Sequence, residues 1–450
     1  MIPTLGIAKL LHEKYNIVYA LPKKFQWFPE SHGYSYINLE SVPFAFGYEP
    51  VIRKAEGSKS IYLDSYRDRR NGRLAKHRAR KLKVITDEIR PVFIFSDILS
   101  STDFILLYPY LKNNGAGFAI HNPMLSTYTM KGIPRIGSSL TTEQVVKTRI
   151  ENLRIKFMIG AFNLKQSVLY PFCSDRSLIK NEFAKNRIPM RFRLAGDNHF
   201  TKMFKYVPEI ITAPEELEFC MGRKKENQYY VGSLIDRNRN EKNRNPETQE
   251  FINKIKEWES EKKRIVFCAF GSMSQEHSKI IASFLEKLFA VFSKHPGLKL
   301  ACAFSGKNNS MDKTKLTPNV FLFPYLPQLS ILQYADLFIT HAGLGSVKEA
   351  IFCGVPMLAY PFTAGWDSNG NATKVNFHQL GLRGNILKDS KEQVEEKIIR
   401  LLTDTGYQNT ISNFRKHTLE KYGEQEFLEL FEKIKNNIDW SPQRQPVNGL

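Results

Sequence analysis

The chain has 450 residues, of which 42% are hydrophobic and 12% aromatic, so it can form packed cores and is not a wholly disordered protein. Its formal net charge of +20, from 65 Lys and Arg against 45 Asp and Glu, suits an anionic partner such as nucleic acid, a membrane surface or a charged small molecule. Its apolar runs are far shorter than the ~18 residues of a membrane-spanning helix, and its first residues lack the features of a signal peptide. The five cysteines form no Cys-x-x-Cys pair, so they predict neither a metal nor a redox site, and a cytoplasmic location is expected.

The first half of the chain alternates short strand-like runs with longer helical patterns. Strands are expected at residues 16–21, 92–96 and 117–120, helices at 58–89 and 101–113, mostly helical structure at 142–190, and extended segments at 209–212 and 228–232. Strands that alternate with helices are typical of a parallel sheet with crossover helices. At roughly 100–200 residues per domain, the length allows about two to four such domains.

A polar segment divides the chain. Residues 235–247 are almost entirely charged or polar, which predicts an exposed linker between a first domain at 1–234 and a second at 248–406. The second domain alternates again, with strands expected at 264–269, 298–304, 319–324, 336–340 and 356–360 and helices at 276–293 and 344–352. It is therefore predicted to be a second doubly wound α/β unit, followed by a helical segment at 407–440 and a frayed tail at 441–450.

The densest basic segment runs from Arg67 to Lys83 and holds nine Lys or Arg residues plus His77. As a functional surface it would bind anions or a membrane, and as a structural feature it would be the solvated face of a crossover helix. The structural interpretation is favoured, because the segment lacks the bulky apolar stripe of an interfacial helix and the interleaved aromatic residues of a nucleic-acid site.

The stretch from Tyr325 to Ala372 has the pattern of a phosphate site. A strand is expected to end at Thr340, a turn of small residues follows, and a helix begins near Leu344, so free N–H groups would face the crevice at the end of the strand. The glycines of the turn allow close approach of an anion, and Ser346 and His341 can each donate to a diphosphate oxygen.

Two further side chains of this stretch could hold a nucleoside. Glu349 lies one helical turn beyond Ser346, where its carboxylate could accept from two ribose hydroxyls. Tyr325 offers a flat face for a base, and such stacking is worth about 1–3 kcal/mol. A lone His-x-Gly turn is more often an ordinary loop, and a lone Glu near a helix start is usually a cap, so the prediction depends on order and spacing.

That order and spacing resemble the donor-binding signature of the GT1 family of nucleotide-sugar glycosyltransferases, which includes plant secondary-product, macrolide and carotenoid enzymes. The signature has an aromatic residue followed three residues later by Gln, a His-x-Gly-x-x-Ser turn with Glu three residues beyond, a Gly-Val-Pro, and an acidic residue before Asn-Ala. The matching positions are Tyr325, Gln328, His341, Gly343, Ser346, Glu349, Gly354, Val355, Pro356, Asp367, Asn371 and Ala372.

The resemblance implies a GT-B fold, an α/β architecture of two facing Rossmann-like doubly wound domains. A sugar nucleotide would lie in the cleft, and a C-terminal helix would cross back to the first domain. A Gly-Ser loop after the first strand of the second domain would approach the donor phosphates. The donor-binding residues that the resemblance implies are Gly271, Ser272, Tyr325, Leu326, Gln328, His341, Gly343, Leu344, Gly345, Ser346, Glu349, Asp367 and Ser368.

The family's reaction is an inverting transfer without a metal, so the resemblance implies no cofactor and a UDP- or dTDP-sugar as co-substrate. A hexose would pass to a hydroxyl of a small, largely apolar acceptor such as a polyketide, terpenoid, aryl-polyene or lipid-like molecule. A base must take the acceptor proton, and positive or N–H groups must stabilise the leaving diphosphate. The family's base is a histidine oriented by an aspartate, and Asp97 corresponds to that aspartate.

Two features depart from the family pattern. When the chain is aligned through its first helix, the family's histidine and first strand would both precede Met1, so we expect the complete protein to carry roughly 10–15 further residues. His12 and His121 are expected to be surface or structural histidines. Ser368 stands where relatives have the Gln that contacts sugar hydroxyls, which leaves the identity of the sugar open.

Three hypotheses remain: glycosyl transfer, a nucleotide-sugar 2-epimerase of GT-B fold, and a non-catalytic sugar-nucleotide-binding protein. Aromatic residues of the first domain suit an apolar acceptor, although core packing is the simpler explanation for them (Phe104, Phe118, Tyr128, Phe157 and Phe162). No nucleic-acid partner is expected, because nucleic acid would explain the charge but not the donor motif. The charge is compatible with peripheral association at the inner face of a membrane that supplies the acceptor, and the oligomeric state is left open.

Overall fold

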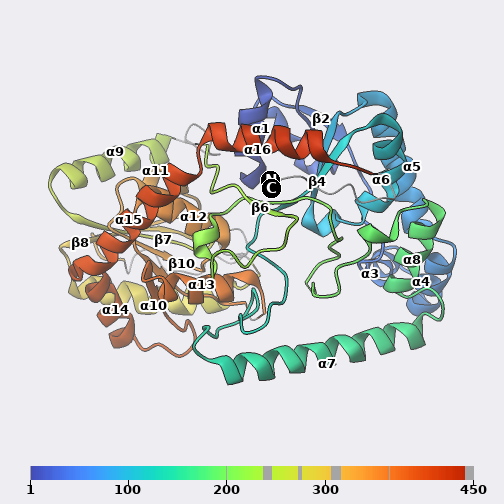
Figure 1. Ribbon diagram of the computed structural model, residues 1–450. Coiled ribbons are helices and arrows are strands. Elements are labelled where there is room, and N and C mark those ends of the chain that lie inside the picture. The colour runs from blue at the N-terminus through green and yellow to red at the C-terminus, as the bar shows by residue number, and fades with distance from the viewer. Residues whose placement is uncertain are drawn as a thin grey trace.

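Two α/β domains lie side by side, each with helices on both faces of its parallel sheet (Figure 1). The structure, a computed structural model, describes residues 2–198, 200–236, 246–271, 276–305, 316–363 and 365–440. Most of the expected linker at 235–247 and the expected tail at 441–450 lie outside these ranges.

The second domain is built on a six-stranded parallel sheet with strand order β12-β11-β10-β7-β8-β9. Its strands are β7 (Arg264–Ala269), β8 (Leu298–Ala303), β9 (Val320–Phe323), β10 (Leu337–Thr340), β11 (Met357–Ala359) and β12 (Gly381–Arg383). Its helices are α9 (Pro246–Ser260), α10 (Ser278–Lys294), α11 (Gln328–Leu332), α12 (Leu344–Cys353), α13 (Asp367–Phe377), α14 (Lys391–Thr403) and α15 (Thr405–Lys421). The chain runs outward to one edge and then returns to the centre, which is the order of a doubly wound fold and confirms the second α/β unit.

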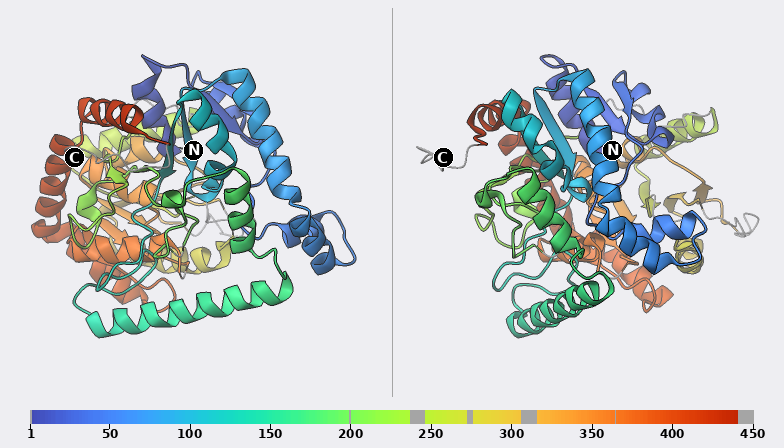
Figure 2. Two further views of the ribbon diagram at one scale, coloured as in Figure 1. Left: turned by 45° about the vertical axis from the view of Figure 1, so that its right-hand side comes forward. Right: turned by 90° about the vertical axis from the view of Figure 1, so that its right-hand side faces the viewer.

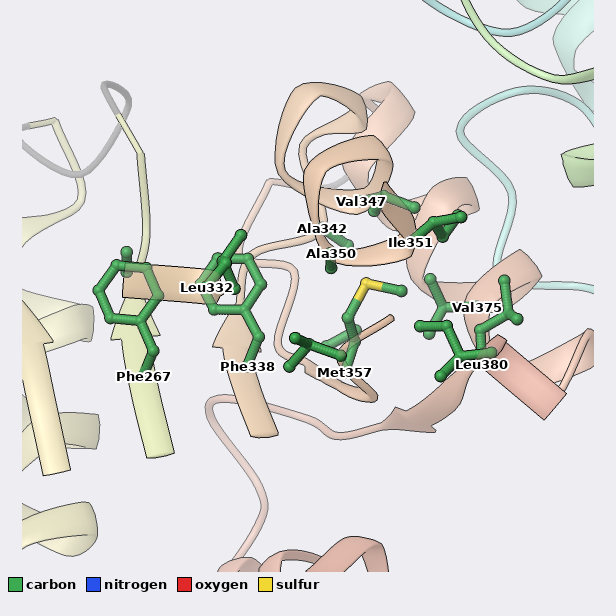
Figure 3. Packing of buried hydrophobic residues seen from close by; sticks show 14 of the residues in the cluster. Phe267, Leu332, Phe338, Ala342, Val347, Ala350, Ile351, Met357, Val375 and Leu380 are labelled. Atoms are coloured by element: carbon green, nitrogen blue, oxygen red, sulfur yellow. The ribbon is translucent and has the colours of Figure 1, made fainter. Parts of the chain in front are cut away.

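Both faces of this sheet are covered, which is why its strands appear as continuous apolar runs in the sequence. Along β7, Ile265 and Phe267 belong to one apolar cluster, and Val266 and Cys268 belong to the cluster on the other face. On the first face Phe267 stacks on Phe338 of β10, with ring centroids 5.1 Å apart, beside the side chains of α12 and α13 (Figure 3). This packing holds the carboxyl ends of β7 and β10 next to each other.

The first domain contains a four-stranded parallel sheet of order β3-β4-β5-β6 and a separate parallel pair, β1 and β2. The strands are β1 (Val18–Leu21), β2 (Ser35–Asn38), β3 (Phe93–Asp97), β4 (Gly117–Asn122), β5 (Glu209–Ile211) and β6 (Gln228–Tyr230). Its helices are α1 (Ile2–His12), α2 (Trp27–Glu30), α3 (Glu49–Ala55), α4 (Ile61–Arg70), α5 (Arg73–Ile89), α6 (Asp103–Asn114), α7 (Val145–Leu169) and α8 (Asp175–Lys185). Short 3-10 turns lie at Lys23–Phe25, Ile98–Ser100, Met190–Phe192 and Glu215–Leu217.

The two sheets of the first domain share their apolar layers. Ala20 of β1 and Ile94 of β3 pack against one cluster, whereas Ile17 and both Phe93 and Phe95 pack against the cluster on the other face. Within the described residues no strand pairs with both β1 and β3. The strand expected upstream of the first residue stays a prediction.

The C-terminal segment crosses back to the first domain, as expected, but it is not one helix. It breaks at Gly423 into α15, which packs on the second domain, and α16 (Glu424–Asn437), which packs on α1 and β4 (Figure 1). Phe431 of α16 lies 4.8 Å from the ring of Phe93 and 5.9 Å from that of Phe95, measured between centroids. These aromatic contacts fix α16 against the four-stranded sheet.

The basic segment at 67–83 differs from the expected solvated face of one crossover helix. Gly72, with a φ of 62°, separates α4 from α5, and two of the cations point inward. Arg69 is buried between Glu49 and Asp175, at 2.8 and 2.9 Å. Arg78 is buried against Asp103, with a shortest N···O distance of 2.6 Å. Part of the local charge therefore serves interior ion pairs, which the charge pattern alone did not reveal.

The expected helical region at 142–190 forms α7 and α8. α7 lies along one edge of the molecule, and Thr148 is its only buried residue (Figures 1 and 2). Among the helices that the structure describes, none is both long enough and apolar enough to span a bilayer.

Candidate functional site

The strand order of the second sheet reverses between β7 and β10, and the carboxyl ends of these strands lie side by side. Thr340, the last residue of β10, is the register partner of Ala269, the last residue of β7. Each strand is followed by left-handed backbone, with a φ of 67° at Gly271 and 62° at Ala342. Such a φ is unfavourable for alanine, so the surroundings must hold the turn after β10 in place. Reversal points of this kind are where α/β proteins bind ligands.

His341 lies at the centre of this reversal point. A Cβ atom on Gly271 would be 2.9 Å from His341 Cε1, and one on Gly343 would be 2.6 Å from His341 Nε2, so both positions accept only glycine without a shift. The imidazole also stacks on Phe362, with centroids 5.5 Å apart. The sequence brings these residues together as expected, whereas Ser272 of the expected Gly-Ser loop lies outside the described residues.

The imidazole of His341 is uncharged at neutral pH, because burial lowers its pKa to about 4. Its Nδ1 atom is buried and has no hydrogen-bond partner in the described part of the chain. An unsatisfied buried polar atom in a folded protein needs an explanation, and a bound ligand is one such explanation. His341 is therefore suited to hydrogen-bond a ligand at this turn rather than to carry charge.

The start of α12 adds further donors beside His341. Gly343 is the N-cap and has no side chain that could accept from the first helical N–H groups, so those of Leu344, Gly345 and Ser346 are available. The space around Gly345 is open, because a Cβ atom there would meet nothing within 4 Å. A helix start with free N–H groups and open space above it is suited to bind an anion.

A second group of polar side chains lies one turn along α12. The Gln328 side-chain amide, at the start of α11, donates to Glu349 Oε2 at 2.8 Å and to Ser346 Oγ at 3.2 Å. Tyr325 precedes this group and is 38% exposed. Leu326 is buried in the core, so its contact with a ligand would be through its main chain.

The start of α13 supplies the remaining expected donor residues. Asp367 accepts from the Asn371 side-chain amide at 3.2 Å, and burial raises the pKa of the Asp367 carboxyl against that hydrogen bond. The same amide donates to the main-chain oxygen of Ala342 at 3.1 Å, which ties α13 to the turn after β10. Ser368 is buried, and its hydroxyl lies 3.0 Å from Thr363 Oγ1. Ser368 is thus directed toward its own domain, whereas Asp367 lies next to the turn.

Asp97 lies at the carboxyl end of β3 in the facing domain. Its Oδ1 accepts from the Leu99 N–H at 2.8 Å, and desolvation raises the pKa of its carboxyl. His121, its register partner on β4, is buried, hydrogen-bonds to Thr212 at 3.3 Å and has a pKa lowered to about 3 by burial. Among the described residues no histidine hydrogen-bonds to Asp97. His12 is exposed at the end of α1, with its ring 5.5 Å from that of Tyr34, so it lies at the surface whereas His121 lies in the interior.

One contact between the domains joins this region to α12 and was not predicted. The ammonium group of Lys348 is completely buried and donates to the main-chain oxygen of Thr212. Burial lowers the pKa of Lys348 to about 8, and its charge contributes to the lowered pKa of His121. A Lys two residues after the motif's Ser gave no signal in the sequence, because its importance depends on the facing domain.

The other unpredicted contact lies at α13. The Asn369 side-chain amide donates to the main-chain oxygen of Gly137 at 2.8 Å. A Cβ atom on Gly370 would be 1.7 Å from the main-chain oxygen of Ile136, so only glycine allows the two domains to approach here. Gly137 and Gly370, which were unexplained in the sequence, therefore mark a close approach of the two domains.

The aromatic residues considered for an acceptor pocket do not form one. Phe104 and Phe118 are completely buried in the core of the first domain, and Tyr128 is buried as well. Phe157 and Phe162 lie on α7 and are 78% and 54% exposed. The sequence could not separate these environments, because the same residue types serve core packing and surface contacts.

Comparisons with known proteins agree with this geometry. Residues 226–418 match the model of the family described as UDP-glucoronosyl and UDP-glucosyl transferase. The chain is 30% identical over 186 residues to a UDP-glucuronosyltransferase of Mus musculus, covering 41% of this chain and 33% of that protein. It is 32% identical over 109 residues to the oleandomycin glycosyltransferase of Streptomyces antibioticus, covering 24% of each.

Similar solved structures extend over nearly the whole chain. The glycosyltransferase of kitacinnamycin matches with a TM-score of 0.64 at 17% identity, covering 96% of this chain and 95% of that chain. The calicheamicin glycosyltransferase matches with a TM-score of 0.63 at 15% identity, covering 97% and 95%. At this identity the likeness shows the fold, and the chain spans less than half the length of the curated relatives it matches. The fold is GT-B, and the resemblance to the GT1 nucleotide-sugar glycosyltransferases that the donor motif predicts is confirmed.

Proposed function

We propose that this protein is an inverting, metal-independent glycosyltransferase that moves a hexose from a UDP-sugar, or a dTDP-sugar, to a hydroxyl of a small, largely apolar acceptor. The observation that carries the proposal is the buried Nδ1 atom of His341, which has no hydrogen-bond partner among the described residues and lies beside the first N–H groups of α12. A neutral donor next to a helix start suits a diphosphate, which offers several oxygens to such donors.

In the proposed reaction, negative charge develops on the leaving diphosphate, next to these hydrogen-bond donors. The acceptor oxygen attacks the anomeric carbon, the bond from that carbon to the diphosphate oxygen breaks, and the diphosphate leaves with the electron pair. Donors already oriented toward the departing oxygens stabilise this charge without rearranging, and one such donor is typically worth about 3 kcal/mol. His341, with Nδ1 protonated, and the N–H groups from Leu344 to Ser346 have this role in the proposal.

Glu349 and Gln328 favour a uridine over a thymidine nucleotide. Gln328 donates to one oxygen of the Glu349 carboxylate and so fixes the orientation of this carboxylate, one helical turn from the phosphate donors. A ribose presents two vicinal hydroxyls to such a carboxylate, and a deoxyribose presents one. Tyr325 lies at the end of this row, where its ring could stack on the base.

Asp97 has a positioning role in the proposal. It lies at the carboxyl end of a strand in the facing domain, where its side chain is exposed. A carboxylate in such a place gains from a protonated or N–H-bearing partner, so it would orient the base that receives the acceptor proton. We assign that base to none of the described residues.

Binding and turnover test the proposal separately. UDP binding is measured by calorimetry for the wild type, for His341→Ala and for the control His295→Ala, whose imidazole contacts Glu395 far from the cleft turn. We expect a loss of binding of about 10-fold or more for His341→Ala only. Equal binding by wild type and His341→Ala would refute the diphosphate role of this turn.

Turnover is measured by mass spectrometry on the complete protein with its native N-terminus, crossing UDP- and dTDP-sugars with phenolic and lipid acceptors. Transfer of a hexose to an acceptor supports the proposal. Interconversion of sugar nucleotides without acceptor would indicate the 2-epimerase instead, and UDP binding without any turnover would indicate a binding protein. Asp97→Asn is expected to lower turnover more than UDP affinity.

A further inference from the structure

α7 carries a row of large apolar side chains that nothing in the described protein covers. We call this row the α7 stripe; it consists of Val146, Ile150, Leu153, Phe157, Leu164 and Val168. Each of these side chains is more than half exposed, and Phe157 is 78% exposed. Single exposed apolar residues are ordinary, but a contiguous row along a 25-residue helix indicates a contact surface.

The α7 stripe faces away from the protein. At about 100° of rotation per residue, its six members fall within an arc of about 60° on the helix surface. The residues of α7 that are buried or half-buried lie on the opposite side, and they include Thr148, Asn152, Ile155, Ile159 and Gln166. The stripe therefore lies on the side of α7 away from the protein, and Met158 and Phe162 on the other half of the helix are 66% and 54% exposed as well.

Basic residues border the stripe on both sides. By the same rotation, Arg149 and Lys156 follow one border, and Lys147, Arg154 and Lys165 follow the other. All five are exposed, and none forms a salt bridge within the described part of the chain. Two cations of the segment at 67–83 differ from these, because Arg69 and Arg78 form ion pairs with buried carboxylates.

The position of α7 leaves the stripe open to a large flat surface. In the three views α7 forms the lower boundary of the molecule, and no other described element extends past it (Figures 1 and 2). A 25-residue helix is about 38 Å long, so the contact would be extended rather than a point.

We propose that α7 lies in the surface of an anionic lipid bilayer, with the α7 stripe inserted at the level of the headgroups and the basic borders paired with lipid phosphates. An apolar row between two rows of Lys and Arg is the pattern of an interfacial helix, whose long cationic side chains reach back to the headgroups. Each such cation near an anionic surface contributes to binding, and binding weakens as salt screens it.

A second copy of the chain suits this surface less well. Two stripes packed face to face would bring the basic borders of both helices alongside each other, where coiled coils place charges of opposite sign. α7 has one acidic residue, Glu151, and it lies on the protein-facing side. The charge pattern therefore favours an anionic partner over self-association.

Vesicle sedimentation tests the proposal. The wild type is mixed with vesicles of phosphatidylcholine alone and with vesicles of equal parts phosphatidylcholine and phosphatidylglycerol, at low and at physiological salt. We expect binding to the anionic vesicles only, weaker at the higher salt. Leu153→Ser/Phe157→Ser/Leu164→Ser and Lys147→Glu/Arg154→Glu/Lys165→Glu are each expected to weaken binding about 100-fold.

Two control variants test whether vesicle binding depends on this surface or only on the overall charge and hydrophobicity of the protein. Lys76→Glu/Arg80→Glu/Lys83→Glu makes the same charge change on exposed positions of α5, and Leu63→Ser/Met221→Ser/Leu387→Ser removes exposed apolar side chains elsewhere. Both are expected to bind vesicles like the wild type. Circular dichroism and UDP binding check the fold of every variant, and Phe157→Trp reports insertion by a blue shift of its fluorescence on anionic vesicles.

Four results would overturn the proposal. These are no binding to anionic vesicles, equal binding to both kinds of vesicle, an equal loss in the α5 control, or a dimer that the stripe variant dissociates while the wild type ignores vesicles. The readout needs no sugar nucleotide, so it is independent of the proposed transfer reaction.

Discussion

Gly343→Ala should disable the turn after β10 through a single added methyl group. The backbone of Gly343, with φ of −58° and ψ of 138°, is one that any residue adopts, so the substitution causes no backbone strain. The new Cβ atom would instead lie 2.6 Å from Nε2 and 2.9 Å from Cε1 of His341. The imidazole, stacked on Phe362, has to move by several tenths of an ångström or more to relieve these contacts.

The size of the effect follows from what the ring does. If His341 donates to the diphosphate, its displacement forfeits a hydrogen bond to a charged group, about 1.5–3 kcal/mol, which raises the Kd for UDP by about 10- to 100-fold. Overpacking adds about 1–3 kcal/mol of lost stability. Gly297→Ala is the control variant, because its Cβ atom would also meet nothing within 4 Å and Gly297 lies outside the candidate site. It should leave UDP affinity within about threefold.

Calorimetry with UDP and thermal unfolding of the two variants check this prediction. The reasoning requires weaker binding for Gly343→Ala and a separation of the two variants. If Gly343→Ala binds UDP like the wild type, the position of the His341 ring does not matter for the diphosphate. If Gly297→Ala weakens binding as much, the clash with the ring is not the cause.

Three further predictions concern buried or held charges. Lys348 has a pKa of about 8 in the folded protein and 10.5 as its ordinary value, so between pH 8 and 10.5 the unfolded chain binds more protons than the folded one. The free energy of unfolding should therefore rise with pH in this range, by up to about 3 kcal/mol. Urea titrations should show this rise in the wild type and not in Lys348→Met. Arg78→Met leaves the Asp103 carboxylate buried without its partner and should cost about 3–5 kcal/mol of unfolding free energy. Arg78→Met/Asp103→Leu should recover part of this loss. If denaturant titrations of the single and double variants show no recovery, the loss does not come from the unpaired carboxylate. Glu349→Gln should reduce the preference for UDP over 2′-deoxy-UDP by about 10-fold in calorimetry, and an unchanged preference would remove Glu349 from the ribose.

Much of the second domain was predictable because its elements are local. Each strand is a short apolar run, and each is bounded by residues that end strands, so β7, β8, β9, β10 and β11 fall within one or two residues of their expected positions. β12 and β2 were missed, because neither Gly381–Arg383 nor Ser35–Asn38 is a continuous apolar run. The candidate site was predictable for the same reason: His341, Gly343 and Ser346 lie within one turn and one helix start.

Contacts between distant segments were not predictable. The burial of Arg69 and Arg78, the approach of Gly370 to Ile136 and the inward direction of Ser368 each depend on a partner far away in the sequence. A charge, a glycine or a hydroxyl has the same appearance in the sequence whether its partner is water or protein.

The amino-acid sequence by itself determined the two α/β units and the donor motif, because apolar periodicity and turn residues act over a few neighbouring positions. Only the tertiary structure decided which surfaces those units leave free. The net charge of +20 is the clearest case. Two cations of the densest basic segment form buried ion pairs, whereas the cations of α7 face solvent beside an exposed apolar row. An apolar stripe packs equally well against a core or a membrane, and which of the two it meets is set by where the rest of the chain lies.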